Sequence, residues 1–370
     1  MKYKRMPIEI ESPEEYGYGN IKFNLSESSI TDRTLKSLGL EIPDLTLLYN
    51  EHRGNESLRK LVVQDFPNLN SQNVLITAGA AGALFIIATS QLAPTDHLVV
   101  VRPNYATNLE TPETIGCKIT YVDLDFDNSF QIDLHALQSA IKGNTKMVSI
   151  TSPHNPSGTT LSKSDLNEIV SMTRSRGCLL LVDETYRDIH HGTQIPLAAS
   201  LDTHVISVSS MSKSFGMPGL RIGWIITQNN TLLENFLAAK EQTSISGSVI
   251  DEFIAEQILF RRHEILASTI AEQKERLQMV QDWMQTEDLL DWVKPSGGVV
   301  SFPRMKSEPP GGYDAFYERL LVKHHTYVGR GRWFSVSDRY FRLGYGWPSK
   351  EELEQGLECI SRALREGSGV

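Results

Sequence analysis

The sequence predicts an α/β protein whose large domain is a mostly parallel sheet covered by helices, joined to a smaller α/β domain. Between about residues 55 and 230, short β-branched runs alternate with amphipathic helical stretches. Those runs are continuously apolar rather than alternating, as expected of strands buried on both faces. Short strands return after a long helical span, which indicates the second domain.

The strands expected in the large domain occupy residues 74–79, 97–103, 117–124, 146–153, 178–186, 204–212 and 220–227. A helix is expected at 162–177, where Gly177 supplies a stop signal. After residue 230 the pattern is helical, and then short strands are expected at 297–303 and 339–346, before a final helix near 351–364. We predict an N-terminal segment of the small domain at 1–45, a large domain at 46–274 and the rest of the small domain at 275–370.

Composition narrows the classes of partner. The chain has 370 residues and a formal net charge of −9, with its acidic residues scattered along the sequence. Such a surface repels nucleic acid and anionic membranes, so neither is an expected partner. The start of the chain has no apolar run of the kind that marks a secretory signal. Three cysteines without metal spacing suggest buried thiols, no metal site and a cytoplasmic setting.

Polar or small residues follow several of the predicted strands at the point where each strand ends. They are Gly79, Tyr105, Asn155, Asp183 and Lys213. In parallel sheets the carboxyl ends of the strands meet at one edge, and ligands bind there. This shared placement is the first indication of an active site.

Lys213 lies in a turn of small residues directly after an apolar strand. A lysine in such a loop is usually a surface residue, but its neighbours favour another role. Ser210 and Ser212 offer hydroxyls to a phosphate, and Arg221 offers a bidentate clamp. A desolvated lysine close to other cations has a lowered pKa, as an amine that forms an imine requires.

Asp183 ends an apolar strand, and Tyr186 follows three residues later. A helix-capping aspartate would account for this pattern without any function. A carboxylate facing the nitrogen of a pyridine ring would instead keep that ring protonated and able to accept electrons. Tyr186, and Asn155 in the turn HNPSG, could bond the phenolic oxygen of the same ring, although Asn-Pro and Ser-Gly are also ordinary turn formers.

Three further positions have both a structural and a functional interpretation. The turn at Gly79 offers backbone N–H groups to a phosphate, or simply allows close packing. Tyr105 could stack on a ring or belong to the core. Arg342 lies within a short apolar strand, where charges are rare unless paired, and its fork matches a free α-carboxylate.

A set of motifs in a fixed order gives the most specific signal. They are YNEHRGNESLR (49–59), TAGAAGAL (77–84), RPNYATN (102–108), HNPSG (154–158), VDETY (182–186), SSMSKSFGMPGLRIGW (209–224), PSGGVVSFP (295–303) and YFRLGYG (340–346). Together they resemble the class I and II aminotransferases, which are pyridoxal-5′-phosphate enzymes of fold type I. HNPSG and GGVVSFPR are similar to a subgroup that contains capreomycidine synthases.

The resemblance implies a role for each matching position. It makes Lys213 the Schiff-base lysine that also carries protons. It makes Asp183 the partner of the pyridine nitrogen, and Tyr105 the residue that stacks on the ring. We expect these three residues to be catalytic. It assigns the ring oxygen to Asn155 and Tyr186, and the phosphate to Gly79, Ala80, Ala81, Ser210, Ser212 and Arg221. It implies that Arg342, together with Asn155, binds the carboxylate of the substrate. It also implies a homodimer in which Tyr49 of one subunit contributes to the active site of the other.

Some residues depart from the family pattern, and they leave the reaction open. Ser26 and Glu27 replace the usual apolar-Gly pair where relatives contact substrate, so both are candidate substrate residues. One hypothesis is transamination between an amino acid and a 2-oxo acid. A second is elimination, replacement, cyclisation or oxidation of a specialised amino acid, such as an arginine-like one. A third is a non-catalytic regulator with the same fold. Such regulators carry an N-terminal DNA-binding domain, and the motifs of this sequence begin near residue 24, so we expect no room for one.

Overall fold

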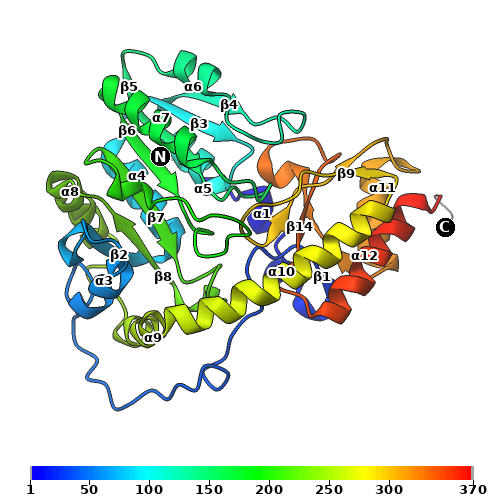
Figure 1. Ribbon diagram of the computed structural model, residues 1–370, viewed down its shortest axis with the longest axis horizontal. Coiled ribbons are helices and arrows are strands. Elements are labelled where there is room, and N and C mark those ends of the chain that lie inside the picture. The colour runs from blue at the N-terminus through cyan, green and yellow to red at the C-terminus, as the bar shows by residue number, and fades with distance from the viewer. Residues whose placement is uncertain (1, 368–370) are drawn as a thin grey trace.

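The computed structural model describes residues 2–367, and within them a seven-stranded sheet forms the centre of the large domain (Figure 1). Its order is β2–β8–β7–β6–β5–β3–β4. The strands are β2 (Val74–Ala78), β3 (His97–Arg102), β4 (Lys118–Asp123), β5 (Thr145–Thr151), β6 (Leu179–Asp183), β7 (Val205–Ser210) and β8 (Ile222–Ile226). Neighbours are parallel except where β8 runs antiparallel to β2 and β7. The predicted α/β fold with a mostly parallel sheet is confirmed.

Both faces of this sheet are buried, as the continuous apolar runs predict. On β3, Val99 and Val101 join one core cluster with residues of α6 (Leu134–Ala140) and α7 (Lys163–Ser175). The alternate residues, Leu98 and Val100, join another with α4 (Gly79–Gln91), α5 (Ala106–Ile115) and α8 (Asn230–Glu241). Successive side chains of a strand point to opposite faces, so an apolar residue at every position requires helices on both sides.

A third cluster packs α3 (Glu56–Val63) and α9 (Val249–Phe260) beside β2 and β8. From there α10 (Arg262–Thr286) runs without a break toward the second domain (Figure 1). This helix spans residues 274 and 275, between which the sequence predicts the domain boundary. The boundary itself remains a prediction.

The second domain is built around short strands and the C-terminal helix α12 (Lys350–Arg365). Its remaining elements are β1 (Phe23–Asn24), β9 (Leu290–Asp291), β10 (Val300–Ser301), β11 (Arg304–Met305), α11 (Gly312–Glu318), β12 (Thr326–Tyr327), β13 (Gly329–Arg330) and β14 (Phe341–Gly344). Near the start of the chain, β1 pairs with β12. The strand expected at 297–303 is shortened to β10, because Gly298 has φ +71° and Pro303 cannot donate to a ladder.

Two N-terminal segments lie outside these layers. The helices α1 (Pro7–Ile10) and α2 (Pro13–Tyr16) lie between the two domains, near the carboxyl edge of the large sheet (Figure 1). Residues 40–50 form an arm without helix or strand at the lower edge of the molecule. Among residues 2–367, no helix combines the length and the apolar character that crossing a bilayer requires.

Candidate active site

The strand ends converge on one cavity of about 510 Å³. Of the candidates from the sequence, the following line it: Ser26, Glu27, Ala80, Ala81, Tyr105, Asn155, Asp183, Tyr186, Ser210, Ser212, Lys213, Arg221 and Arg342. Because β8 runs antiparallel to β7, its amino end lies at the same edge as the carboxyl end of β7. That reversal brings Arg221, the residue before β8, beside Ser210 and Ser212.

One end of the cavity fits a phosphate group. Helix α4 begins at Gly79, and Ala78 before it supplies no side-chain cap, so the first backbone N–H groups of the helix are free to bind an anion. Gly79 has φ +71°, and a Cβ there would lie 2.4 Å from Arg221 Nη2. A Cβ on Gly223 would lie 2.7 Å from the backbone nitrogen of Ala80. Two glycines thus let the guanidinium and the helix N-terminus share one small space.

Lys213 reaches into the centre of the cavity. Its Nζ donates a hydrogen bond to Ser28 Oγ at 2.9 Å. Burial lowers the pKa of Lys213, and the positive charges of Arg342 and Arg221 lower it further, while Glu27 opposes them. The amine is therefore closer to its neutral, nucleophilic form than a surface lysine is.

Asp183 is 5% exposed at the end of β6. Its Oδ1 accepts hydrogen bonds from the backbone N–H of Thr185 at 3.1 Å and from the Thr185 hydroxyl at 2.5 Å. Its Oδ2 is 3.4 Å from the Asn108 amide, which donates to it. Burial raises the pKa of Asp183, although these hydrogen bonds act in the opposite direction. A cationic ring nitrogen facing this carboxylate would restore its charge balance.

Arg342 lines the cavity from β14 of the second domain and is 4% exposed. Its Nη2 donates to the carbonyl oxygen of Ser26 at 2.6 Å, and its Nη1 to Asn155 Oδ1 at 3.4 Å. Within residues 2–367 its Nε has no hydrogen-bond partner. A buried guanidinium without a carboxylate partner is suited to an anionic ligand.

Several predicted residues make contacts that the sequence did not indicate. Tyr186 donates its hydroxyl proton to the Ser28 carbonyl at 2.6 Å, and burial raises its pKa to about 12. The Ser26 hydroxyl donates to Asn24 Oδ1 at 2.8 Å, so its backbone carbonyl rather than its side chain meets Arg342. Glu27 accepts a hydrogen bond from the Tyr18 hydroxyl at 3.2 Å, and burial raises its pKa.

Tyr105 and Tyr49 lie in very different surroundings. Tyr105 precedes α5, lines the cavity and has a pKa raised mainly by burial. Tyr49 is 78% exposed on the arm and is absent from the lining of the cavity in its own subunit.

Sequence reasoning missed several residues of the site. Ser28, Thr185 and Asn108 hold Lys213, Tyr186 and Asp183 in place. Trp333 lines the cavity, and so do five residues of the N-terminal segment, which are Ile8, Glu9, Ser12, Pro13 and Glu14. For Thr185 and Asn108, the motifs VDETY and RPNYATN already contain the residue. The N-terminal helices have four residues each and give no periodic signal.

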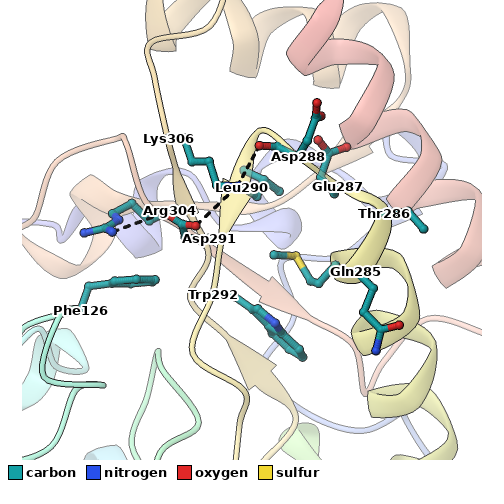
Figure 2. A pocket seen from close by; sticks show the side chains of 11 residues that line it. Phe126, Gln285, Thr286, Glu287, Asp288, Leu290, Asp291, Trp292, Arg304 and Lys306 are labelled. Atoms are coloured by element: carbon teal, nitrogen blue, oxygen red, sulfur yellow. Dashed lines mark hydrogen bonds and ion pairs between the residues drawn. The ribbon is translucent and has the colours of Figure 1, made fainter.

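A second hollow of about 530 Å³ is lined by residues at the end of α10 and on β9 and β11 (Figure 2). Arg304 is ion-paired with Asp291 at 3.4 Å, and its guanidinium lies 3.9 Å from the centre of the Phe126 ring. The Lys306 amine donates to the carbonyl of Asp288 at 2.9 Å. The described residues that line this hollow include none of the predicted site residues. Its charges already bind one another, so the strand-end cavity is the candidate active site.

Comparison with known proteins agrees with this geometry. The family model "Aminotransferase class I and II" matches residues 20–360. The chain belongs to that family. It is a pyridoxal-phosphate-dependent enzyme of fold type I, so the predicted family, fold and cofactor are confirmed.

Three relatives illustrate the range of this family. Capreomycidine synthase from Streptomyces vinaceus is 28% identical, with 94% of this chain and 91% of the relative covered. A PLP-dependent aminotransferase from Streptococcus suis 89-1591 has a TM-score of 0.91 and 27% identity over 98% of both chains. The PLP-dependent cyclase OrfR has a TM-score of 0.89 and 25% identity, also over 98% of both chains.

Proposed function

We propose that this enzyme is an aminotransferase that moves the α-amino group of an amino acid to a 2-oxo acid, with Lys213 at the reaction centre. One observation carries the proposal. The amine of Lys213 opens on to the same cavity as a buried carboxylate, Asp183, and two arginines from different domains, Arg221 before β8 of the large sheet and Arg342 on β14 of the second domain. Two anion sites flanking an amine suit a phosphorylated cofactor and a substrate carboxylate together.

Each group of residues has a task in holding the cofactor. The N–H groups at Ala80 and Ala81, the hydroxyls of Ser210 and Ser212 and the Arg221 guanidinium would hold the phosphate. Asp183 would face the ring nitrogen, and Tyr105 would cover a ring face. Asn155 would donate to the ring oxygen, and Tyr186 would do the same once its hydroxyl proton turns away from the Ser28 carbonyl. When bound, pyridoxal phosphate supplies an aldehyde for the substrate amine and a ring that withdraws electrons from its Cα.

The chain's own residues then bind the substrate and move its protons. Arg342 would bind the α-carboxylate through its fork and so direct the Cα proton toward Lys213. The lowered pKa of Lys213 keeps the amine ready to take that proton. The N-terminal segment lies over this end of the cavity and would limit the access of water.

Amino-group transfer can be tested directly. The protein loaded with pyridoxal phosphate is incubated with each of the common amino acids and a 2-oxo acid, and new amino acids are measured by chromatography. We expect one donor–acceptor pair to react, and the Lys213→Ala variant to be inactive with that pair. If no pair yields a new amino acid, the transamination proposal is wrong.

A second candidate reaction is elimination or cyclisation of an amino acid with a cationic side chain. Three carboxylates, Glu9, Glu14 and Glu27, line the cavity at its N-terminal side. Glu27 is half-buried and would be stabilised by a cationic group, whereas Glu9 and Glu14 are exposed and add negative charge to this side of the cavity. Two relatives are a synthase and a cyclase. This candidate is favoured if arginine-like amino acids are consumed without any amino acid being formed from the 2-oxo acid.

We also propose a cytoplasmic homodimer in which Tyr49 completes the partner's phosphate site. An exposed tyrosine on an arm that leaves the body of its own subunit supports this, as do Leu47 and Leu48 beside it, which are exposed apolar residues. The cysteines Cys117, Cys178 and Cys359 are buried and unpaired, as expected of a reducing compartment.

Mixing Lys213→Ala with Tyr49→Phe subunits should produce hybrid dimers with one intact site. If the mixture gains no activity over its components, Tyr49 acts within its own subunit or not at all.

A further inference from the structure

The N-terminal segment of residues 7–16, here called the roof, has an anchor of its own. Its two helices have four residues each, too few to be stable alone, so tertiary contacts must fix its position. Residues on both sides of Glu11, including Glu9 and Ser12, line the cavity. Glu11 itself does not, because its side chain contacts the small domain.

Glu11 makes a cluster of hydrogen bonds with that domain. Its Oε2 accepts from Trp333 Nε1 at 2.6 Å and from Arg332 Nε at 3.2 Å, and its Oε1 is ion-paired with Arg332 Nη2. Its backbone carbonyl accepts from the Tyr327 hydroxyl at 2.6 Å. One carboxylate therefore binds an indole and a guanidinium together, and charge-assisted hydrogen bonds of this kind are strong.

Trp333 links this anchor to the substrate clamp. Its ring is 3% exposed and lines the cavity, and the guanidinium carbon of Arg342 lies 5.6 Å from its centre. Gly329, which pairs with Arg342 across β13 and β14, packs closely against the ring, because a Cβ at that position would lie 2.8 Å from it. The indole can hardly move without disturbing the contact with Arg342, and its N–H needs a partner when buried.

From these contacts we propose that Glu11 is a positioning residue for the substrate's α-carboxylate site. It orients Trp333 against Arg342 and holds the roof over the cavity through the same carboxylate. The roof and the carboxylate clamp then form one unit, so that loosening one weakens the other. This inference rests on the proposed function, because it takes Arg342 as the group that binds the substrate carboxylate.

The test compares an amino acid with the amine that lacks its carboxylate. The dissociation constant of each is measured from the change in cofactor absorbance, in wild type, Glu11→Ala and Glu11→Gln. Glu15→Gln is the matched control, since Glu15 lies in the same segment but pairs with exposed Arg5 and does not line the cavity. Hydrogen–deuterium exchange of residues 7–16 is followed in the same samples.

We expect Glu11→Ala to weaken amino-acid binding roughly 10- to 100-fold, as the loss of a charged hydrogen-bond group does. Glu11→Gln, which still accepts from the indole, should lose about threefold or more, and Glu15→Gln less than about twofold. The amine does not use Arg342 and should weaken by no more than about twofold. Exchange of the roof should rise in Glu11→Ala and stay unchanged in Glu15→Gln.

Further variants guard against a merely structural effect. Trp333→Phe keeps a ring but removes the N–H, and should reproduce the Glu11→Ala shift, with the double variant no worse than either single one. Equal weakening of amine and amino acid, or unchanged amino-acid binding, would overturn the proposal. If the cofactor absorbance of wild type changes with no amino acid, the proposed function is wrong. In that case hydrogen–deuterium exchange of residues 7–16 in Glu11→Ala still tests whether Glu11 anchors the roof.

Discussion

The two ends of the active-site cavity are built in different ways. At the phosphate end, backbone N–H groups, small side chains and strand termini form the wall, and the sheet fixes their positions. At the substrate end, the walls are side chains from the N-terminal helices, the loop at 26–28 and the small domain. Groups belonging to a sheet keep one geometry, whereas short helices and loops can change sequence without disturbing the core.

The charges of the two ends differ as well. The cations Lys213, Arg221 and Arg342 surround the positions where the chemistry requires anions. The acids Glu9, Glu14 and Glu27 line the same cavity, and we propose that they face the side chain of the substrate. From this difference we infer that the sheet positions the cofactor and the reacting atoms, while residues of the N-terminal segment contribute to the choice of substrate. Substitutions at one end of the cavity at a time can test this difference.

Breaking the cofactor end should have the largest effect. Asp183→Asn keeps the shape of the side chain but removes the charge that faces the ring nitrogen. We expect turnover to fall by roughly 10²–10³-fold, in line with the loss of a preorganised electrostatic group. Steady-state kinetics with the substrate pair found by screening measures this. A variant with more than about a third of wild-type turnover would remove Asp183 from the reaction centre.

The same substitution should stabilise the protein without cofactor. Burial raises the pKa of Asp183 above its value in the unfolded chain, so the folded state disfavours the carboxylate form. That penalty is present at neutral pH, begins to shrink as the pH falls below the folded-state pKa, and is gone below the pKa of the unfolded chain. Thermal unfolding at pH 7 should therefore show a higher Tm for Asp183→Asn than for wild type, and the difference should shrink in acid.

Breaking the carboxylate clamp should have the next largest effect. Arg342→Lys keeps a positive charge but loses the fork that reaches Ser26, Asn155 and a carboxylate together. We expect KM for the amino acid to rise about 10- to 100-fold with a smaller change in kcat. Equal loss in kcat with unchanged KM would mean that Arg342 acts on the reacting bond and not on the carboxylate.

Glu14→Gln tests the acidic wall at the substrate end. The change removes one negative charge and keeps the side-chain volume. We expect the ratio of kcat/KM for cationic over neutral amino acids to fall about tenfold, since the site is partly open to solvent. Glu15→Gln, in the same helix and outside the cavity, is the control. An unchanged ratio would leave side-chain selection to Glu9 and Glu27.

The smallest effect is a shift in pH dependence. Glu27 raises the pKa of Lys213, against burial and the nearby arginines, which lower it. Removing its charge in Glu27→Gln should let that pKa fall further, so the neutral amine persists to lower pH. The rate of covalent cofactor capture, measured against pH, should then keep its maximum value further into acid than in wild type. A shift toward alkaline pH would contradict this electrostatic account.

Sequence reasoning worked best where function follows from strand ends. Lys213, Asp183 and Asn155 were predicted because a residue after a buried parallel strand can only lie at the carboxyl edge of the sheet. The reversal of β8 was not predicted, although it explains why Arg221 joins them. The prediction of a longer strand at 297–303 was wrong, because the positive φ of Gly298 interrupts the extended backbone.

The substrate end was harder to predict, for a physical reason. Glu14 and Trp333 belong to elements of four residues, which are too short to show a periodic pattern. The Ser28 hydroxyl accepts a hydrogen bond from Lys213, and the Ser28 carbonyl accepts one from Tyr186. Both contacts join residues more than 150 positions apart. Contacts of that kind depend on tertiary packing, which single-sequence patterns do not encode. The roles of the site residues, the dimer and the use of Tyr49 remain predictions.

The most direct test of the central claim is chemical trapping on Lys213. The protein is loaded with pyridoxal phosphate, reduced with borohydride and digested, and its peptides are analysed by mass spectrometry. We predict a phosphopyridoxyl group on Lys213, and none on Lys240, a buried lysine of α8 that does not line the cavity. An unmodified Lys213 in protein that has otherwise taken up the cofactor would contradict the account.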